Sequence, residues 1–492
     1  MAESIILSKS RLKRGLQCTK SLYFTLHQKH LEPKPGPALQ AQFDEGHEVG
    51  VLARQQLGRG KGYLIDLKPW DFHGYVRETK AAIERGEDLI FEASVQTGNL
   101  FARTDILKRN TSSGKWDIME VKKSTDVRRD HIDDMTIQYL ISGKAGVAIE
   151  RLYVVHINRD CVFPNLEELF VIRDVTEQVL ENVNSMKGRL NELWKMAKVT
   201  TEPVNDIGPH CDSPYKCVFK GHCWQKIPAM SVFNIYKIGG KKWEYYNEGI
   251  ISIDEVNPED FSGNVKRMIE CTRSNTRFID REGIRSALSE FEFPLYFLDF
   301  ETAMYAIPRY HGTRPYQQLP FQYSLHVWRA PESSTLEHFE FLHTNDSDPG
   351  RQLAEKLLTQ IGPVGSLVAY NRKFEMECLN SIGKRFPDLK DKLEDFISRF
   401  VDPLPIFQNH VYDPKFKGTF SIKTVAPALL GDQASYEGME IADGEMAQVT
   451  LRNLITGKYS NLGRCTRENL LAYCRKDTQV MVDLVKWLYA TQ

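Results

Sequence analysis

Long hydrophobic runs and paired cysteines, which would identify a membrane protein or a disulfide-rich secreted protein directly, are scarce in this sequence. No run of about 18 apolar residues occurs, and the start, MAESIILSKSRLKRG, has an acidic residue at position 3 and an apolar run of only three residues. We therefore expect neither a membrane span nor a secretory signal. Nine cysteines, an odd number in a chain of 492 residues, favour metal ligands and buried thiols over a disulfide framework. Together these absences predict a cytoplasmic protein.

The sequence also has no excess of charge of either sign, because it contains 64 Lys and Arg residues and 65 Asp and Glu residues. Any nucleic-acid surface must therefore be local. Two basic patches are candidates, and for each the alternative is an ordinary solvated face. They are Lys9, Arg11, Lys13 and Arg14 near the start, and Lys122, Lys123, Arg128 and Arg129 further on.

The chain is long enough for two large domains, and its 41% of hydrophobic residues can build real cores. Strand-like alternation over 89–122, followed by helical and strand patterns, predicts an α/β fold for the first part. From Pro294 onward, strands and helices alternate to the end of the chain. The predicted domains are 1–228 and 292–492, with a small helical joining module over 229–291.

Two helices are predicted within the first domain after its strands. The first runs from Asp130 to about Gly143. The second is long and amphipathic, begins near Asp174, which has the spacing of a capping box to Glu177, and runs to about Ala197. A further strand, RLYVVHI, is predicted between them.

The first chemical pattern consists of Asp105, Glu120 and Lys122. The strand period of two places Glu120 and Lys122 on the same face. Cleavage of a phosphodiester requires carboxylates that hold Mg²⁺ and a cation that orients the attacking water and offsets developing charge. Alone the pattern is weak, and its alternative is a solvated strand end. Its context strengthens it, because His47 precedes it on a predicted helix and the segment DMTIQYL, with Gln138, follows it.

A second pattern is the segment CDSPYKCVFKGHC, which contains Cys211, Cys217 and Cys223 at even spacing. Three thiolates form an incomplete metal site, so a fourth ligand is expected elsewhere in the chain.

The order of these residues resembles that of RecB-type PD-(D/E)xK nucleases of the iron-sulfur branch, which includes the CRISPR adaptation exonucleases and the AddB helicase-nuclease subunit. In this family one cysteine precedes the nuclease core and three follow it, so the resemblance implies Cys18 as the fourth ligand. It also implies a [4Fe-4S] cluster that joins both ends of the nuclease domain. Four thiolates also suit zinc, for which His210 and His222 are substitute ligands.

The same resemblance implies roles for the residues of the nuclease core. Asp105 and Glu120 are implied to bind metal, and Lys122 to act on the water and the phosphate. His47 is implied as an additional metal ligand, and Gln138 as a structural or substrate contact.

A second group of acids begins in LYFLDFET, an apolar strand that ends with Asp299 and Glu301. Alternation places both carboxylates on one side of the strand, where they could share a metal. Near the end of the chain, LLAYCRKDTQVMV is predicted as a helix in which Tyr473 and Asp477, four residues apart, lie on one face. Between these segments, VAYNRKFE is an apolar strand followed by Glu375.

This arrangement resembles the DnaQ-like, or DEDD, exonucleases of the RNase H-like fold, in the subgroup whose last motif is Y-x-x-x-D. Such enzymes use four acids for two Mg²⁺ ions, one that activates water and one that steadies the leaving oxygen, while the tyrosine orients the water. One position departs from the family pattern, because Glu375 stands where aspartate is usual. Asp402 is the candidate substitute or fourth ligand.

Across nearly the whole chain, RPYQQLPFQYSLHV, HFEFL and GTFSIKTVAPALL resemble segments of an uncharacterised bacterial family. That family joins an iron-sulfur RecB-type domain to a DnaQ-like domain. The implied fold class is α/β, with a PD-(D/E)xK restriction-endonuclease-like core carrying an Fe-S staple, plus an RNase H-like mixed-sheet domain. The five cysteines outside the implied cluster are predicted to be buried thiols: Cys161, Cys271, Cys378, Cys465 and Cys474.

These patterns favour a phosphodiester hydrolase with Mg²⁺ or Mn²⁺ at two sites. Its expected substrate is DNA, as single strands or ends that it degrades exonucleolytically, in repair, recombination or defence. One alternative is a single active nuclease whose other domain only binds nucleic acid. Another is a non-catalytic nucleic-acid-binding scaffold for a helicase or an integrase. A helicase or another repair or defence protein is the candidate partner, and no membrane is expected.

Overall fold

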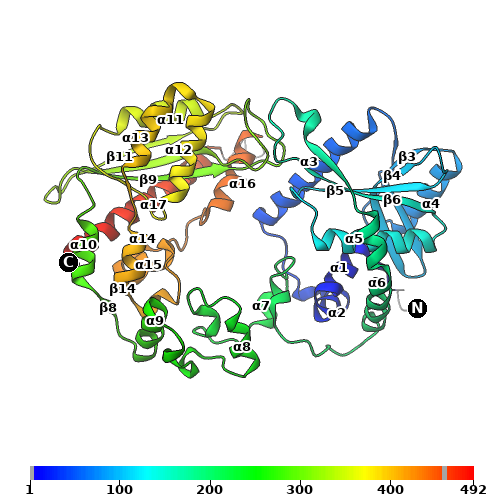
Figure 1. The fold of residues 1–492 in the computed structure, drawn as a ribbon, viewed down its shortest axis with the longest axis horizontal. Helices are drawn as coiled ribbons and strands as arrows, with labels where there is room; N and C mark the ends of the chain where they lie inside the picture. Colours follow the sequence, from blue (N-terminus) through cyan, green and yellow to red (C-terminus); the bar gives the residue numbers. More distant parts are fainter. Residues whose placement is uncertain (1–4, 457–462) are drawn as a thin grey trace. The chain divides into compact units, whose positions relative to one another are not determined.

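The computed structural model describes residues 5–456 and 463–492, which form two compact units (Figure 1). Within these residues, no helix is both long enough and apolar enough to cross a membrane. The first unit extends to Lys226 and includes Tyr305–Arg309 and Thr313–Tyr316, and the second comprises Ile227–Met304, Tyr310–Gly312 and Gln317–Gln492.

The first unit contains a mixed sheet of seven strands in the order β2-β3-β4-β5-β6-β7, with β1 beside β4. β4 pairs antiparallel with β3 and β5, whereas β5 and β6 are parallel and are connected through α5. The strands are β1 (Leu7–Ser8), β2 (Tyr63–Leu64), β3 (Leu89–Thr97), β4 (Leu100–Arg109), β5 (Trp116–Lys122), β6 (Ile149–Ile157) and β7 (Phe170–Asp174).

Helices cover both faces of this sheet, whose strands are drawn in blue to teal in Figure 1. α4, α5 and α6 share one core with the sheet, α3 packs on the opposite face, and α1 and α2 pack against α6. The helices are α1 (Lys9–Gln17), α2 (Thr19–His27), α3 (Pro37–Gly58), α4 (Phe72–Glu84), α5 (Arg129–Lys144), α6 (Thr176–Ala197) and the single turn α7 (Lys220–Cys223).

Strand alternation decides which side chains face α5. Ile118 of β5 lies in the core beneath α5, so Glu120 and Lys122, two and four residues later, face the same side. Leu107 of β4 lies in the same core, which places Asp105 on that face as well. The three strands expected over 89–122 are confirmed, and their pleat brings three candidate site residues to one face.

The start of α6 differs from the prediction. Its N-cap is Val175, and Asp174 accepts a hydrogen bond from the Thr176 N–H at 2.9 Å without forming a capping box. Asp174 is the last residue of β7, where pairing with Tyr153 of β6 keeps it extended. Sheet pairing therefore outweighs the local capping signal.

The second unit contains a mixed five-stranded sheet in the order β11-β10-β9-β12-β13 and a small sheet of β8 and β14. β9, β10 and β11 are antiparallel, and β12 is parallel to β9 and β13. The strands are β8 (Phe278–Ile279), β9 (Leu295–Ala303), β10 (Leu319–Trp328), β11 (Leu336–Leu342), β12 (Leu367–Val368), β13 (Phe400–Val401) and β14 (Val411–Tyr412).

The second sheet is also covered on both faces, so the expected α/β class is confirmed. α11, α12 and α13 share a core with one face, and α14, α15 and α17 with the other. Phe297 of β9 lies in the α17 core, so Asp299 and Glu301 also face α17. The helices are α8 (Lys241–Asn247), α9 (Gly263–Ser274), α10 (Arg281–Leu288), α11 (Gly350–Gln360), α12 (Lys373–Arg385), α13 (Lys390–Ser398), α14 (Leu404–His410), α15 (Ile422–Leu430), α16 (Gly444–Ile455) and α17 (Gly463–Thr491).

The segment with α8, α9 and α10 packs into the core of the second unit. Val232, Ile269 and Ile284 share a buried cluster with Leu484 of α17, and β8 pairs with β14. These helices therefore support the same face of the sheet that carries Asp299.

Candidate functional site

Buried charged and polar side chains gather between the sheet and α5 of the first unit. We call Asp105, Glu120, Lys122, Asp134 and Gln138 the first acid cluster. The Lys122 ammonium lies 2.7 Å from Glu120 Oε1 and 2.6 Å from Asp134 Oδ2. Gln138 donates from Nε2 to Glu120 Oε2 at 2.9 Å, and Asp105 accepts a backbone N–H of β5 at 2.7 Å. The structure therefore brings four of the expected site residues together with Asp134.

Two lysines of α1 also enter the first acid cluster. Lys9 donates to Glu120 Oε1 at 2.7 Å and lies 3.3 Å from Asp134 Oδ1, and Lys13 Nζ lies 3.6 Å from Asp134 Oδ2. Their spacing of four residues places both on one face of α1, which was the available signal. The sequence identified them only as part of a basic patch, because a contact across 111 residues leaves no local pattern.

Charge compensation divides the acids of this cluster into two kinds. Burial raises the pKa of Asp105 to about 7, and the Glu120 carboxylate adds to the shift. Burial also acts on Glu120, but the ammonium groups of Lys122 and Lys9 outweigh it and keep its pKa below the ordinary value. Burial disfavours the Lys122 cation, yet Asp134 and Glu120 raise its pKa well above 10.5. Glu120 is therefore ionised at neutral pH, whereas Asp105 titrates near pH 7.

The donor chemistry of this cluster suits a divalent cation held by Asp105 and Glu120. Both side chains offer carboxylate oxygens, the ligands that Mg²⁺ and Mn²⁺ prefer. A cation beside Asp105 would also balance the charge that burial leaves uncompensated, which is the reason for its raised pKa.

His47 is not part of the hydrogen-bond and ion-pair network that the described residues form in the first acid cluster. It is exposed on α3, and no hydrogen bond or ion pair joins it to an acid of that cluster within the described residues. α3 packs on the sheet face opposite α5, through Leu57 beside Phe91. The role of His47 as a metal ligand stays a prediction.

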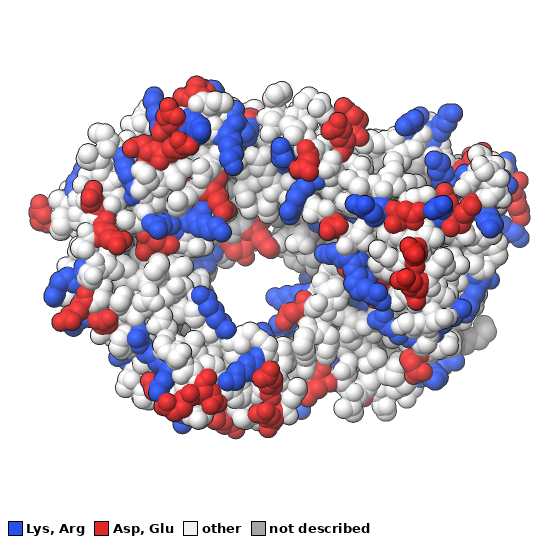
Figure 2. Space-filling view, in the orientation of Figure 1, with Lys and Arg blue, Asp and Glu red and all other residues white. Residues whose placement is uncertain are grey.

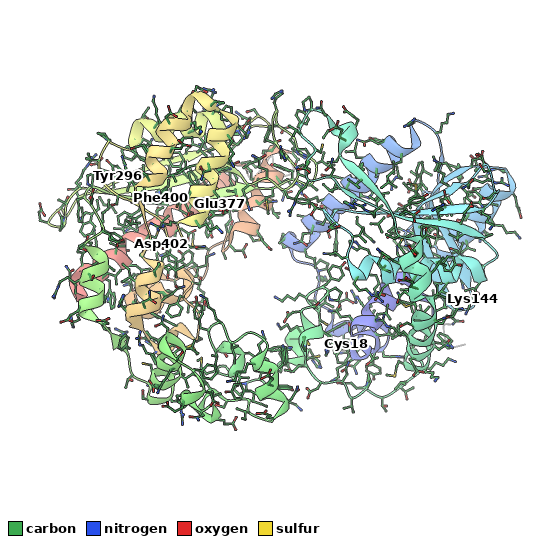
Figure 3. The ribbon with its side chains drawn as sticks, in the orientation of Figure 1. Cys18, Lys144, Tyr296, Glu377, Phe400 and Asp402 are labelled. Carbon is green, nitrogen blue, oxygen red and sulfur yellow. The ribbon has the colours of Figure 1, made fainter. Side chains whose placement is uncertain are left out.

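The four cysteines implied as cluster ligands surround one cavity of about 50 Å³. Cys18 lies between α1 and α2 and is labelled in Figure 3. Cys223 ends α7, and the Cys217 N–H donates to the Cys211 carbonyl at 2.8 Å. The two segments that carry these thiols lie far apart in the sequence but share this cavity.

The sulfur of Cys18 is surrounded by hydrogen-bond donors. Asn205 donates from Nδ2 to Sγ at 3.2 Å. Burial raises the pKa of the Cys18 thiol, whereas the backbone N–H groups of Ser21 and Lys20 lower it. Donors to sulfur favour a thiolate and are typical of the surroundings of metal ligands. The thiols therefore fit a thiophilic metal centre.

The other sulfur and imidazole groups are also placed by the structure. His210 lines the cysteine cavity, and the His222 ring packs edge-on against Phe24 at 5.2 Å between centroids. The side chain of Cys465 lies outside the described residues. The remaining predicted thiols are buried as expected: Cys161, Cys271, Cys378 and Cys474.

Acidic side chains also gather around Asp299 in the second unit, and we call Asp299, Glu301, Glu375 and Asp477 the second acid cluster. Ligand atoms of Asp299, Glu301 and Cys474 all lie within 4.8 Å of one another. The structure therefore brings the strand acids and the α17 residues together. Cys474, which the sequence suggested only as a buried thiol, is part of this group because it follows Tyr473 on the inner face of α17.

Burial without charge compensation characterises the second acid cluster. Burial raises the pKa of Glu301 to about 8, and Asp477 adds to it. Burial raises the pKa of Asp299 well above 3.8, and repulsion from the carboxylates of Asp477, Glu301 and Glu375 raises it further. Burial also raises the pKa of Glu375 to about 8, and its buried Oε2 has no hydrogen-bond partner among the described residues. A divalent cation would compensate these carboxylates, so the donor set fits one.

Two hydroxyl groups and one lysine border the second acid cluster. Tyr436 donates to Asp477 Oδ1 at 2.6 Å, and Lys423 donates to the Tyr473 hydroxyl at 3.0 Å. The Lys423 ammonium also lowers the pKa of Glu301, although burial and Asp477 raise it more. Sequence reasoning identified Tyr473 but missed Lys423 and Tyr436, whose loops and helices meet α17 only in the folded chain.

Glu375 and Asp402 occupy different settings. Glu375 lies in the first turn of α12, a helix, and not at the strand end that the sequence suggested. Asp402, labelled in Figure 3, accepts the backbone N–H groups of Asn371, Arg372 and Leu404 at 2.9–3.1 Å. Both of its oxygens thus hold the loop that leads into α12. Its role as a metal ligand stays a prediction.

Comparisons with known proteins give a partial picture. A family model described as a domain of unknown function (DUF2779) matches residues 296–421. No curated protein matches the chain significantly. A crystal structure of SSO0001 matches with 15% identity, 45% of this chain and 88% of that chain covered, and a TM-score of 0.23. An alkaline exonuclease (LHK-Exo) from Laribacter hongkongensis matches with 13% identity, 39% and 90% covered, and a TM-score of 0.18.

Proposed function

We propose that this protein is a metal-dependent DNA nuclease with two hydrolytic sites, one in each unit. The observation that carries the proposal is that each unit holds a separate buried acid cluster on one face of its sheet. The first unit would act as a RecB-type PD-(D/E)xK nuclease and the second as a DnaQ-like exonuclease. Single-stranded DNA or DNA ends are the proposed substrates, in repair, recombination or defence.

Divalent metal ions, when bound, would polarise the phosphate and lower the pKa of the attacking water. In the first site, Asp105 and Glu120 would hold the ion. Lys122, fixed by Glu120 and Asp134, would orient the water and offset charge on the phosphate. Gln138 donates to Glu120 and thereby fixes the carboxylate in a single orientation.

In the second site, Asp299, Glu301 and Asp477 would hold the ions. Tyr473 would orient the water through its hydroxyl, which Lys423 holds by donating a hydrogen bond. Because Lys423 donates to the hydroxyl oxygen, the tyrosine proton is left for an acceptor, and a hydrogen bond from Tyr473 to Asp477 lowers the pKa of that acid. Tyr436 fixes Asp477 by donating to Oδ1.

The four-cysteine site would hold a [4Fe-4S] cluster, with zinc as the alternative. The shared cavity and the donors around Cys18 support a ligated centre of either kind. Visible absorption and the iron and zinc content of the purified protein distinguish the two. A colourless protein with stoichiometric zinc would reject the iron-sulfur assignment.

The test of the two-site proposal is a time course on end-labelled single-stranded DNA with Mg²⁺ or Mn²⁺. It compares the wild type, Lys122→Ala, Asp299→Ala and the double variant. We expect each single variant to lose one activity, by about a hundredfold or more, and the double variant to lose both. Full activity in the double variant would place both active sites elsewhere.

A single active nuclease is the second candidate, and one observation favours it. Lys9 and Lys122 already compensate Glu120, whereas no ion pair within the described residues joins the acids of the second cluster, which only Lys423 compensates in part. If only Asp299→Ala abolishes cleavage while Lys122→Ala reduces DNA binding alone, the first unit is a nucleic-acid-binding unit.

A further inference from the structure

A pocket of about 510 Å³ opens beside the first acid cluster. Its walls come from α1, from α5 and α6, and from the loop that joins Cys211 to Cys217. Lys13 belongs to both places, since it lines the pocket and its Nζ lies 3.6 Å from Asp134 Oδ2. The volume falls within the range of about 300–1,000 Å³ that holds small ligands. The pocket is therefore large enough for one nucleotide unit and directly adjoins the candidate nuclease site.

Tyr215 presents an aromatic ring in this pocket, and its position is fixed. The side chain is 43% exposed, yet its hydroxyl accepts from Arg128 Nη2 at 2.9 Å and donates to Asp130. Gln17 donates to the Tyr215 carbonyl at 2.6 Å, which also holds the backbone. An exposed ring that is held at both ends loses little conformational entropy when a planar group stacks on it. Tyr215 is thus a fixed aromatic surface, and the Lys13 ammonium and the Arg128 guanidinium each lie 5.5 Å from its ring centroid.

Basic residues outnumber acidic ones in the pocket lining. Two acids, Asp130 and Asp133, face five basic residues. The chain as a whole has a net charge of −1, and Figure 2 shows both signs interspersed over the visible face. Ion pairs with Asp134, Glu32 and Asp133 already engage four of these basic residues, so Lys216 is the basic side chain of the lining for which the described residues show no ion pair, and it suits a phosphate group. The five basic residues are Lys13, Arg14, Arg129, Arg189 and Lys216.

We propose that this pocket binds one nucleotide of the strand that enters the first acid cluster. Tyr215 stacks on the base, as aromatic platforms do in proteins that bind single strands, and Lys216 contacts the phosphate. The inference rests on the proposed function and adds the path of the substrate to it. The same chemistry would accept a free mononucleotide released by cleavage, which the experiment separates from a strand.

Binding is measured by fluorescence anisotropy of a fluorescein-labelled dT20 strand with Ca²⁺ in place of Mg²⁺, and a gel verifies that the strand is intact. We expect Tyr215→Leu to raise the Kd about tenfold. Tyr215→Phe should raise it less than Tyr215→Leu does, because the ring remains although the hydroxyl contacts that hold it are lost. Trp70→Leu is the matched control. Trp70 is 71% exposed with Lys68 Nζ 5.9 Å from its ring, and it does not line this pocket.

A second variant tests the phosphate contact without touching the ring. Lys216 is exposed, so Lys216→Ala leaves the packing of the cysteine loop intact. Loss of one phosphate contact should lower the slope of log K against log salt concentration by about 0.7 for a single strand. An unchanged slope would overturn the proposed phosphate contact. Iron and zinc content is measured for every variant. If Tyr215→Leu has lost metal, the pocket inference is accepted or rejected on Lys216→Ala alone.

Competition with dTMP separates the two nucleotide sources. We expect millimolar dTMP to leave dT20 binding unchanged, whereas displacement at affinity equal to that of the strand would reassign the pocket to the product. If the wild type cuts dT20 but both variants bind it normally, the pocket inference fails and the nuclease proposal stands. If no metal supports cleavage yet Tyr215→Leu weakens binding, the nuclease proposal fails and the pocket inference stands.

Discussion

The two acid clusters differ in how their negative charge is balanced. In the first, ammonium groups of Lys9 and Lys122 lie 2.7 Å from the same oxygen of Glu120. In the second, Glu301 and Glu375 are buried and have pKa values raised to about 8. Apart from Asp105, whose pKa is raised to about 7, the first cluster is a balanced ionic network without added ions. The second cluster depends on protons or metal for its balance. Similar acids on similar sheets can therefore differ in whether they need protons or metal ions to balance their charge.

The largest expected difference between the units concerns the four cysteines of the shared cavity, which lie in the first unit. Cys217→Ala should remove the metal and destabilise the first unit by roughly 3 kcal/mol, because metal binding is coupled to folding. This corresponds to a decrease of roughly 6–12 °C in the melting temperature of that unit. Calorimetry and metal analysis measure both effects. Cys271→Ala, a buried thiol of the second unit, is the control and should retain the metal.

The second difference concerns pH. A carboxyl whose pKa is raised in the folded state stabilises the fold most at a pH below its unfolded-state pKa, which is 4.5 for Glu301. That stabilisation is lost as the pH rises through the folded-state pKa of about 8. Without divalent metal, we expect the melting temperature of the second unit to fall between pH 5 and 8. Added Mg²⁺ should flatten this dependence, and Glu301→Gln should weaken it. A melting temperature that rises over this interval would contradict the charge imbalance.

The third difference concerns competition for Glu120. Because the Lys9 and Lys122 ammonium groups share Oε1, Lys9→Met removes one of the two cations that compete with metal for that oxygen. The Mg²⁺ concentration for half-maximal activity of the first site should fall roughly fivefold, equivalent to about 1 kcal/mol. Titration in the Asp299→Ala background isolates this site. Lys34→Met, an exposed lysine in a loop, is the control, and an equal shift there would remove the argument.

The smallest expected effect concerns Lys423, which borders the second cluster. Its removal in Lys423→Met should raise the pKa values of Glu301 and Asp477 further. The alkaline shift of the second-site pH–rate profile is expected to be roughly half a unit. Lys423→Arg keeps the positive charge and should leave the profile in place. A shift in both variants would indicate altered packing of Tyr473.

Much of the fold could be predicted because its signals are local. The alternation in WDIMEVK gives the facing of β5, and the spacing of Tyr473 and Asp477 gives their common helix face. In β3 the alternation is interrupted at Glu92, whose φ is 59°, so that Ile90 and Ala93 lie in the same core. The strand over LYFLDFET likewise places Asp299 and Glu301 on one side. In each case the period of the element carries the information.

The remaining site residues could not be predicted because their partners are distant in the chain. Lys9 reaches Glu120 across 111 residues, and Tyr436 reaches Asp477 across 41. Their neighbours in sequence show no pattern of this contact. Asp402 is another example, since nothing near it in sequence indicated that its oxygens accept the backbone N–H groups of Asn371 and Arg372, about 30 residues earlier.

The contact between Cys18 and Asn205 has a consequence for synthesis of the chain on the ribosome. The two residues are 187 positions apart. At about 5–20 residues per second, Asn205 follows Cys18 by roughly 10–40 s. During that time α1 and α2 have emerged, but the segment that completes the cysteine cavity does not yet exist. The Cys18 thiol therefore stays in an incomplete nascent domain during this time, where it is exposed to oxidants and to other nascent chains.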